Sequence, residues 1–190
     1  MSNLYFDIET LSTSSEAVVL SAAILWFDLE NDQNIEYEEL LNRALFVKFE
    51  IKEQALKGRK ISRSTIEWWK NQSEEARKMS FIPSSYDVSG LEGLELLTQY
   101  ANTHLDKNGF AWQRGNFDSM IIESMYRAYD LEPFIRYNKW METRTFIRLT
   151  KDTCNSNAYC KIPNFDKKLV IKHDPIHDIA YDTLMILKGE

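Results

Sequence analysis

The sequence predicts an α/β fold in which a central sheet of mixed strand direction is flanked by helices. Two observations lead to this expectation. The first half contains three segments rich in apolar, β-branched and aromatic residues, joined by short connections that are typical of an antiparallel meander. The second half alternates a short apolar segment with amphipathic helices, and such strand–helix units favour parallel strands. We therefore expect three antiparallel strands followed by parallel strands.

The three N-terminal strands are expected over residues 3–7, 17–27 and 44–51. The second is a long apolar run bounded by the polar segment 28–32, which indicates a central strand. The third alternates apolar and polar side chains with the period of two that a strand with one buried face requires.

A longer helix is expected over residues 64–78, because Ser64 and Glu67 have the spacing of a capping box. In this motif the serine caps the helix and the glutamate reaches back to the first turn. The last helix of the chain is expected to carry Pro175 in its first turn, where proline is well tolerated. The other segments are expected as helix 91–104, strand 110–113, helix 119–129, helix candidate 142–149, loop 152–164 and helix 175–187.

Length and composition limit the class of protein. The chain has 190 residues without repeats or a linker, so we expect one domain over residues 1–190. A net charge of −6 argues against a protein that coats nucleic acid through bulk charge, but not against an enzyme that binds a nucleic-acid end locally. Two cysteines without zinc spacing, and no apolar run of membrane length, predict a soluble, cytoplasmic protein with no membrane contact.

The stretch 4–10 places two carboxylates, Asp7 and Glu9, at the end of the first strand. Strand side chains alternate faces, so these two point the same way and Ile8 points to the other face. Two neighbouring carboxylates oppose each other's ionisation unless a cation lies between them, and oxygen ligands suit Mg²⁺ or Mn²⁺. The alternative is a strand that ends in a solvated acidic turn.

Further acidic residues follow at the ends of other elements. Asp118 follows the expected strand 110–113 at the start of a helix, and His177 and Asp182 lie in the last helix. Strand ends are where α/β folds gather ligands, and four carboxylates with one histidine are the set used in two-metal phosphodiester chemistry. For His177 the alternative is a surface histidine near a helix N-terminus. Asp178 is expected beside the site or solvated rather than as a ligand. The adjacent residues His173 and Asp174 could mimic the pair His177 and Asp182, but they lack its spacing.

Two features could contact a nucleic-acid strand. Lys57, Arg59, Lys60 and Arg63 form the densest basic segment, which would contact phosphates or remain a solvated loop. Trp68 and Trp69 are adjacent on the following helix and cannot face the same way. We expect one in the core and the other either stacked on a base or in a second core contact.

The motifs Asp7-Ile8-Glu9, Asn116-Phe117-Asp118 and His177 to Asp182 resemble, in order and spacing, the three motifs of the DEDDh 3′–5′ exonucleases. These enzymes belong to the ribonuclease H-like superfamily. The segments 64–73 and 173–178 are further similar to the DexA-type exonuclease A branch of the T-even bacteriophages, a similarity that covers nearly the whole chain. A related bacterial branch acts on RNA.

The resemblance implies two Mg²⁺ or Mn²⁺ ions about 3.5–4 Å apart, held by Asp7, Glu9, Asp118 and Asp182. One ion would activate a water, the other would stabilise the leaving 3′ oxygen, and His177 would be the general base. Asn116 would either hold the Asp118 loop or touch the substrate. The expected substrate-binding residues are Thr10, Arg59, Lys60, Trp68, Trp69 and Asn116.

The resemblance favours a 3′–5′ exonuclease that acts on single-stranded DNA and releases nucleoside 5′-monophosphates, in the host bacterial cytoplasm if the protein is phage-encoded. A 3′–5′ exoribonuclease remains the alternative on the same fold. A catalytically silent nucleic-acid-binding module would gain nothing from four acids that face phosphates. A phosphatase of small nucleotides would need neither the basic segment nor the tryptophans.

Overall fold

A five-stranded mixed sheet forms the centre of the computed structural model, which describes residues 1–151 and 157–190. The strand order is β3-β2-β1-β4-β5, with antiparallel pairs β1–β2 and β2–β3 and parallel pairs β1–β4 and β4–β5. The predicted fold class is therefore confirmed. The strands are β1 (Ser2–Thr10), β2 (Val19–Asp28), β3 (Leu45–Lys48), β4 (Ala111–Gln113) and β5 (Trp140–Glu142).

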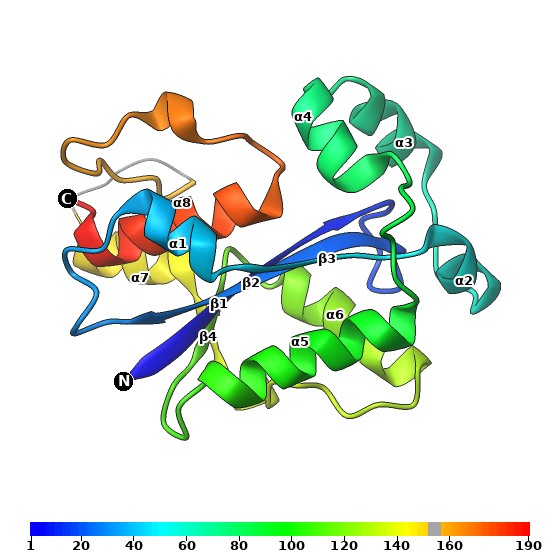
Figure 1. Ribbon diagram of the computed structural model, residues 1–190, viewed down its shortest axis with the longest axis horizontal. Coiled ribbons are helices and arrows are strands. Elements are labelled where there is room, and N and C mark those ends of the chain that lie inside the picture. The colour runs from blue at the N-terminus through cyan, green and yellow to red at the C-terminus, as the bar shows by residue number, and fades with distance from the viewer. Residues whose placement is uncertain (152–156) are drawn as a thin grey trace.

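Helices cover both faces of this sheet (Figure 1), with α1, α7 and α8 on one side and α5 and α6 on the other. Two shorter helices, α3 and α4, lie beyond one end of the sheet. The α-helices are α1 (Tyr37–Arg43), α2 (Ile51–Leu56), α3 (Arg63–Lys70), α4 (Glu74–Ala76), α5 (Gly90–His104), α6 (Phe117–Ala128), α7 (Thr143–Thr150) and α8 (Pro175–Lys188). A π-helical turn covers Arg77–Phe81, and 3₁₀ turns cover Tyr137–Lys139 and Lys167–Leu169.

The side chains of β1 separate the core into two layers. Leu4, Phe6 and Ile8 are buried among residues of α5 and α6, whereas Tyr5 is buried among residues of α1, α7 and α8. This is the period-two alternation of a strand inside a sheet. Asp7 and Glu9 continue the Tyr5 side, so both carboxylates face the layer that contains α8.

Some sequence-based boundaries differ from the structure. The third strand is shorter than expected, because helix α2 begins directly at Ile51. Helix α1 was not expected, and only its residues Tyr37 and Leu40 are buried, so its apolar pattern is too sparse to recognise. Strand β5 was not expected either, because a strand of three residues is too short for an alternating pattern.

The expected single helix over residues 64–78 is wrong, and so is its capping box. Helix α3 begins one residue earlier, after Ser62, and no side chain caps it. The Oγ atoms of Ser62 and Ser64 bond each other at 2.7 Å, and Glu67 pairs with Lys70 at 2.8 Å instead of reaching back. The helix ends at Lys70, and the Ser73 hydroxyl accepts from the backbone N–H of Ala76 to start α4. A local serine pair and a second N-cap thus override the pattern of the motif.

The C-terminal half agrees more closely with expectation. Helices α5, α6, α7 and α8 lie within two residues of the expected ranges, and Pro175 occupies the first turn of α8. Of the expected loop 152–164, residues 152–156 lie outside the described part of the chain, and residues 157–164 contain no helix or strand. In the part that the structure describes, no helix has the length and apolar character needed to cross a membrane.

Candidate active site

The ends of two parallel strands bring the first three carboxylates to one edge of the sheet. Strand β1 pairs with β4 through Leu4–Ala111 and Tyr5–Trp112. Because this pairing is parallel, both strands end at the same edge of the sheet. Asp7 and Glu9 lie near the C-terminal end of strand β1. Asp118 lies in the first turn of helix α6, which follows β4. The topology therefore places Asp118 beside Asp7 and Glu9, as the motif order requires.

These carboxylates raise one another's pKa. Burial raises the pKa of Asp7 well above its usual range, and the charges of Asp118 and Glu9 raise it further. Burial likewise raises the pKa of Asp118 well above its usual range, followed by the charge of Glu9. Without a cation, this edge of the sheet therefore disfavours the ionised form of these carboxylates compared with a carboxylate in water. Such a donor set, made of oxygen atoms in a partly buried place, fits a hard divalent cation.

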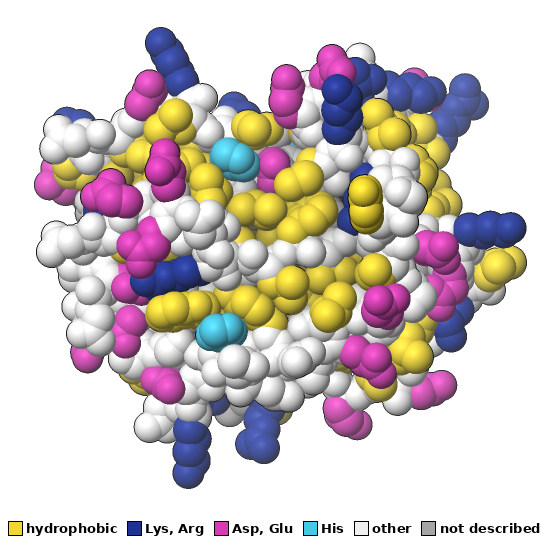
Figure 2. Space-filling model, in the orientation of Figure 1, with side chains coloured by type: hydrophobic (Ala, Val, Ile, Leu, Met, Phe, Trp, Pro, Cys, Tyr) yellow, Lys and Arg dark blue, Asp and Glu magenta, His cyan; other side chains and the backbone are white. Residues whose placement is uncertain are grey.

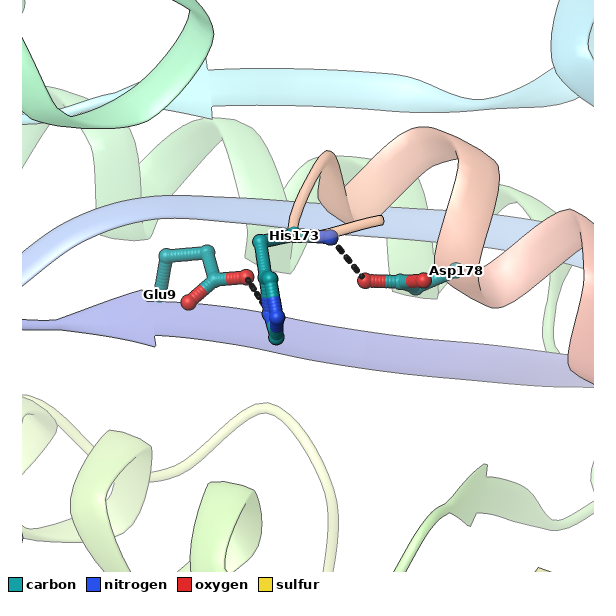
Figure 3. A group of neighbouring side chains, drawn as sticks. All are labelled: Glu9, His173 and Asp178. Atoms are coloured by element: carbon teal, nitrogen blue, oxygen red, sulfur yellow. Dashed lines mark hydrogen bonds and ion pairs between the residues drawn. The ribbon is translucent and has the colours of Figure 1, made fainter. Parts of the chain in front are cut away.

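A second group of side chains closes the site from α8. Figure 3 shows Glu9 on β1, His173 on the loop before α8, and Asp178 on the first turns of α8. One ligand atom from each residue lies within 4.8 Å of the others, close enough for a shared metal ion. The Nδ1 atom of His173 lies 3.7 Å from Glu9 Oε1, and this carboxylate raises the pKa of the His173 imidazole. Burial and the charge of Glu9 raise the pKa of Asp178 to about 7.

The backbone before α8 fixes this arrangement. His173 has a φ of 63°, a left-handed conformation in which histidine is found more often than most residues. Its backbone N–H donates to Asp178 Oδ2 at 3.0 Å, and the Asp174 side chain caps α8 through the backbone N–H of Ile176. The loop and the first turns of the helix therefore form one hydrogen-bonded unit that directs His173 toward β1.

The structure gives the two predicted residues of the last motif other partners. His177 Nδ1 lies 2.8 Å from the Tyr37 hydroxyl, so this histidine joins α8 to α1. Asp182 accepts from Arg114 through both oxygens, at 2.7 and 2.8 Å, and from the Tyr5 hydroxyl at 2.7 Å. In the described residues, the carboxylate grouped with Glu9 and a histidine is that of Asp178, which had been expected beside the site or solvated.

Sequence reasoning had a signal for this pair and missed it. His173 and Asp178 are separated by five positions, as are His177 and Asp182, so both pairs satisfy the spacing H-x-x-x-x-D. His173 had been compared only with its neighbour Asp174. The two matches overlap and are offset by four residues, or about one helical turn. Which of the two pairs faces β1 depends on the residue at which helix α8 begins.

The two tryptophans of α3 divide as expected into a core residue and an exposed one. Trp69 is fully buried, and its indole N–H donates to the Thr10 backbone oxygen at 2.9 Å, directly after Glu9. Trp68 is 42% exposed, and its ring centroid lies 4.8 Å from that of His173. Trp68 is therefore the tryptophan that a substrate at the site can reach.

The other expected substrate contacts are only partly supported. Arg59 is buried, and it donates to the backbone oxygens of Ala17 and Ile121 at 2.8 and 3.4 Å, which corrects the expectation that it meets phosphates. Lys60 keeps an exposed side chain. Thr10 is buried, and its hydroxyl donates to the Ser12 backbone oxygen. Asn116 precedes α6 without a capping hydrogen bond from its side chain, so its contact with substrate stays a prediction.

Lys and Arg side chains on the face drawn in Figure 2 gather at the corner of the molecule where Figure 1 shows α3 and α4. Lys70 at the end of α3 and Lys78 in the π-helical turn that follows α4 are exposed and pair with Glu67 and Glu74. The charges of these two lysines are therefore locally balanced.

Comparison with known proteins identifies the family of the chain. Residues 2–186 match the family model described as the 3′–5′ exoribonuclease Rv2179c-like domain. The exodeoxyribonuclease of Enterobacteria phage T4 is 33% identical over 207 residues, which cover 98% of this chain and 88% of that protein.

Solved structures of exonuclease I share the fold. The apo form matches with a TM-score of 0.60 at 11% identity over 98% of this chain, and a zinc-bound complex of the E. coli enzyme with single-stranded DNA matches with a TM-score of 0.57 at 14% identity over 99%. This chain spans 41% and 40% of those proteins, so the likeness concerns the fold alone. The family match and the phage relative both name an exonuclease. The chain is a 3′–5′ exonuclease and belongs to the family of the Rv2179c-like 3′–5′ exoribonuclease domain.

Proposed function

We propose that the protein is a two-metal-dependent 3′–5′ exonuclease that removes nucleoside 5′-monophosphates from the 3′ end of single-stranded nucleic acid, with DNA favoured over RNA. The observation that carries this proposal is the cluster between the end of β1 and the start of α8, in which one ligand atom each of Glu9, His173 and Asp178 lies within 4.8 Å of the others. The proposed exonuclease domain covers residues 1–190. The phage exodeoxyribonuclease, at 33% identity, supports the preference for DNA, whereas the family description names RNA.

The proposed metal ligands are Asp7, Glu9, Asp118 and Asp178, with Asp178 in place of Asp182. Asp182 has both oxygens engaged by the Arg114 guanidinium, which already neutralises its charge. Asp178 instead has a pKa that burial and neighbouring carboxylates raise to about 7, which is the property of a group that needs a cation. Divalent ions held by these residues would neutralise the negative charge of the reacting phosphate and make a bound water more acidic.

The proposed general base is His173 in place of His177. Its Nδ1 faces Glu9, so Nε2 is the nitrogen that would take the proton from the attacking water. The Glu9 carboxylate would stabilise the imidazolium that results, because it already raises the pKa of His173. The exposed indole of Trp68 contacts this imidazole edge to face. From this position the indole would stack on a base near the 3′ end.

The test of the reaction is digestion of 5′-labelled single-stranded DNA and RNA of matched sequence with Mg²⁺ or Mn²⁺. We expect a ladder that shortens from the 3′ end, with DNA cut faster than RNA, and nucleoside 5′-monophosphates as products. A protein that binds both strands tightly but cuts neither would be a silent binding module, and the proposal would fail.

The choice of histidine has its own test. We expect His173→Ala to lower kcat about 10²–10⁴-fold, the usual effect of losing a general base, with little change in strand affinity. His177→Phe keeps an aromatic ring against Tyr37 and should retain nearly full activity. If instead His177→Phe abolishes turnover while His173→Ala is active, the assignment of the base is reversed.

A further inference from the structure

A cavity of about 390 Å³ opens beside the carboxylate cluster, and its size suits a nucleotide-sized ligand. Asp7, Asp178 and His173 line the side that belongs to the proposed active site. The rest of the lining includes cations and tyrosines that neither the sequence motifs nor the proposed mechanism use. This cationic wall consists of Arg114, Tyr159, Lys167, Lys172 and Tyr181.

Aromatic rings hold one of the cations in place. The Lys167 ammonium lies 5.1 Å from the ring centroid of Tyr159 and 5.5 Å from that of Tyr181. The two rings stack on each other with centroids 6.1 Å apart. Cation–π contacts at these distances attract the ammonium to the rings without neutralising its charge. Lys167 therefore reaches the cavity with its positive charge intact.

The cations of this wall differ in how they are balanced. Arg114 forms a two-pronged ion pair with Asp182, so its charge is matched. Lys167 and Lys172 are exposed, and in residues 1–151 and 157–190 no ion pair joins either ammonium to a carboxylate. Lys172 directly precedes His173, and its charge is felt at that imidazole. Two unmatched positive charges thus face a cavity that also holds the proposed metal ligands.

A polyanionic substrate needs cations of this kind next to four carboxylates. The basic segment that the sequence favoured is a poor source, since Arg59 is buried and donates to backbone oxygens. We infer that Lys167 and Lys172 form a phosphate subsite that binds the phosphate of a nucleotide adjacent to the reacting phosphodiester. This inference rests on the proposed function. The same chemistry would recognise either a phosphate of the bound strand or that of the released mononucleotide.

The test compares variants that replace the charge by a polar side chain only one atom shorter: Lys167→Gln, Lys172→Gln and the double variant. Lys168→Gln is the matched control, because Lys168 is exposed, adjacent to Lys167 and absent from the cavity wall. Binding is measured by fluorescence anisotropy with a labelled single strand in Mg²⁺, in an Asp118→Asn background that slows cleavage. Asp118 does not line this cavity, so the background changes none of the lining residues, and every lysine variant is compared within the same background.

We expect each substitution to weaken strand binding about 5-fold at 0.1 M salt and the double variant about 25-fold, whatever the sequence, because each phosphate contact on a single strand releases about 0.7 counterion. The salt dependence of the double variant should be shallower by about 1.4 units of slope. Competition by thymidine 5′-monophosphate distinguishes the two sources. Loss of strand binding alone places a strand phosphate in the subsite, and weaker competition alone places the released product there.

If both ligands bind the double variant and Lys168→Gln equally well, the subsite does not exist. That failure is separable from failure of the proposed function. A wild-type protein that cuts strands while the lysine variants bind normally refutes only the subsite. A wild-type protein that cuts no strand, while the lysine variants still lose binding, refutes only the nuclease reaction.

Discussion

At the scale of single residues, Asp178 and Asp182 lie one turn apart on α8 and are expected to respond oppositely to neutralisation. Asp178→Asn removes a proposed metal ligand and a buried like charge, so activity should be lost while the metal-free protein becomes no less stable. Asp182→Asn leaves the half-buried Arg114 guanidinium without its charged partner. Breaking such a buried pair typically costs about 3–5 kcal/mol of the free energy of unfolding.

Chemical denaturation and metal-activated turnover, measured on the same preparations, separate these effects. If Asp182→Asn loses Mg²⁺-dependent activity at unchanged stability, Asp182 is a ligand as the sequence motif first indicated.

The residue scale also shows how far the sequence could go. Asp7, Glu9 and Asp118 were predicted from strand alternation and motif order, and the structure brings these three together because β1 and β4 are parallel neighbours. The histidine–aspartate pair was ambiguous because two pairs have the same spacing. Resolving it requires the conformation at His173, whose φ of 63° ends the loop and sets the phase of α8. A left-handed residue that is not glycine leaves no clear signal in a single sequence.

At the scale of elements, helix α3 carries two adjacent tryptophans with different tasks. Trp69→Phe removes the indole donor to the Thr10 backbone oxygen in a fully buried position, which should lower the free energy of unfolding by about 1–3 kcal/mol. Trp68 lies on the exposed side of the helix, so Trp68→Ala should change the free energy of unfolding by less than about 1 kcal/mol. It should instead weaken strand binding by about 1–3 kcal/mol, independent of base identity.

Thermal unfolding and strand affinity of the two variants test this division. Equal losses of affinity in the two variants at matched folded fractions would show that Trp68 makes no separate contact with the strand.

Helices and strands with a long periodic pattern of apolar residues were predicted from the sequence, and those with a short pattern were missed. Strand β2 and helices α5, α6 and α8 have enough buried residues to fix their period. The break between α3 and α4 depends on Ser73 capping a helix of three residues, a local hydrogen bond that the apolar pattern does not record. Arg59 shows the same limit, since its sequence neighbours indicate a basic surface while its guanidinium lies between Ala17, which precedes β2, and Ile121 of α6.

At the scale of the whole molecule, the ionised carboxylates of the site lower the stability of the folded state that brings them together. In the metal-free protein, the raised pKa values of Asp7, Asp118 and Asp178 mean that the folded state binds more protons than the unfolded state above about pH 4, the usual pKa of aspartate. Stability therefore falls as pH rises from about 4 toward 7, where Asp178 ionises in the folded protein. His173, whose pKa Glu9 raises, contributes in the same direction.

Divalent metal should reverse this loss, because cations stabilise the ionised carboxylates and bind only the folded site. At a metal concentration 100 times the dissociation constant, the gain is about 2.7 kcal/mol, or about 5–10 °C in Tm for a chain of this size. The gain should be largest near pH 7 and shrink toward pH 4, where protons occupy the same oxygens. Calorimetric scans from pH 4 to 8 with EDTA, Mg²⁺ or Mn²⁺ measure both trends, and Asp7→Asn is the control that should raise the metal-free Tm near pH 7 and blunt the response to metal. A wild-type Tm that is equal with EDTA and with metal at pH 7 would contradict a preformed cation site at the ends of β1 and β4.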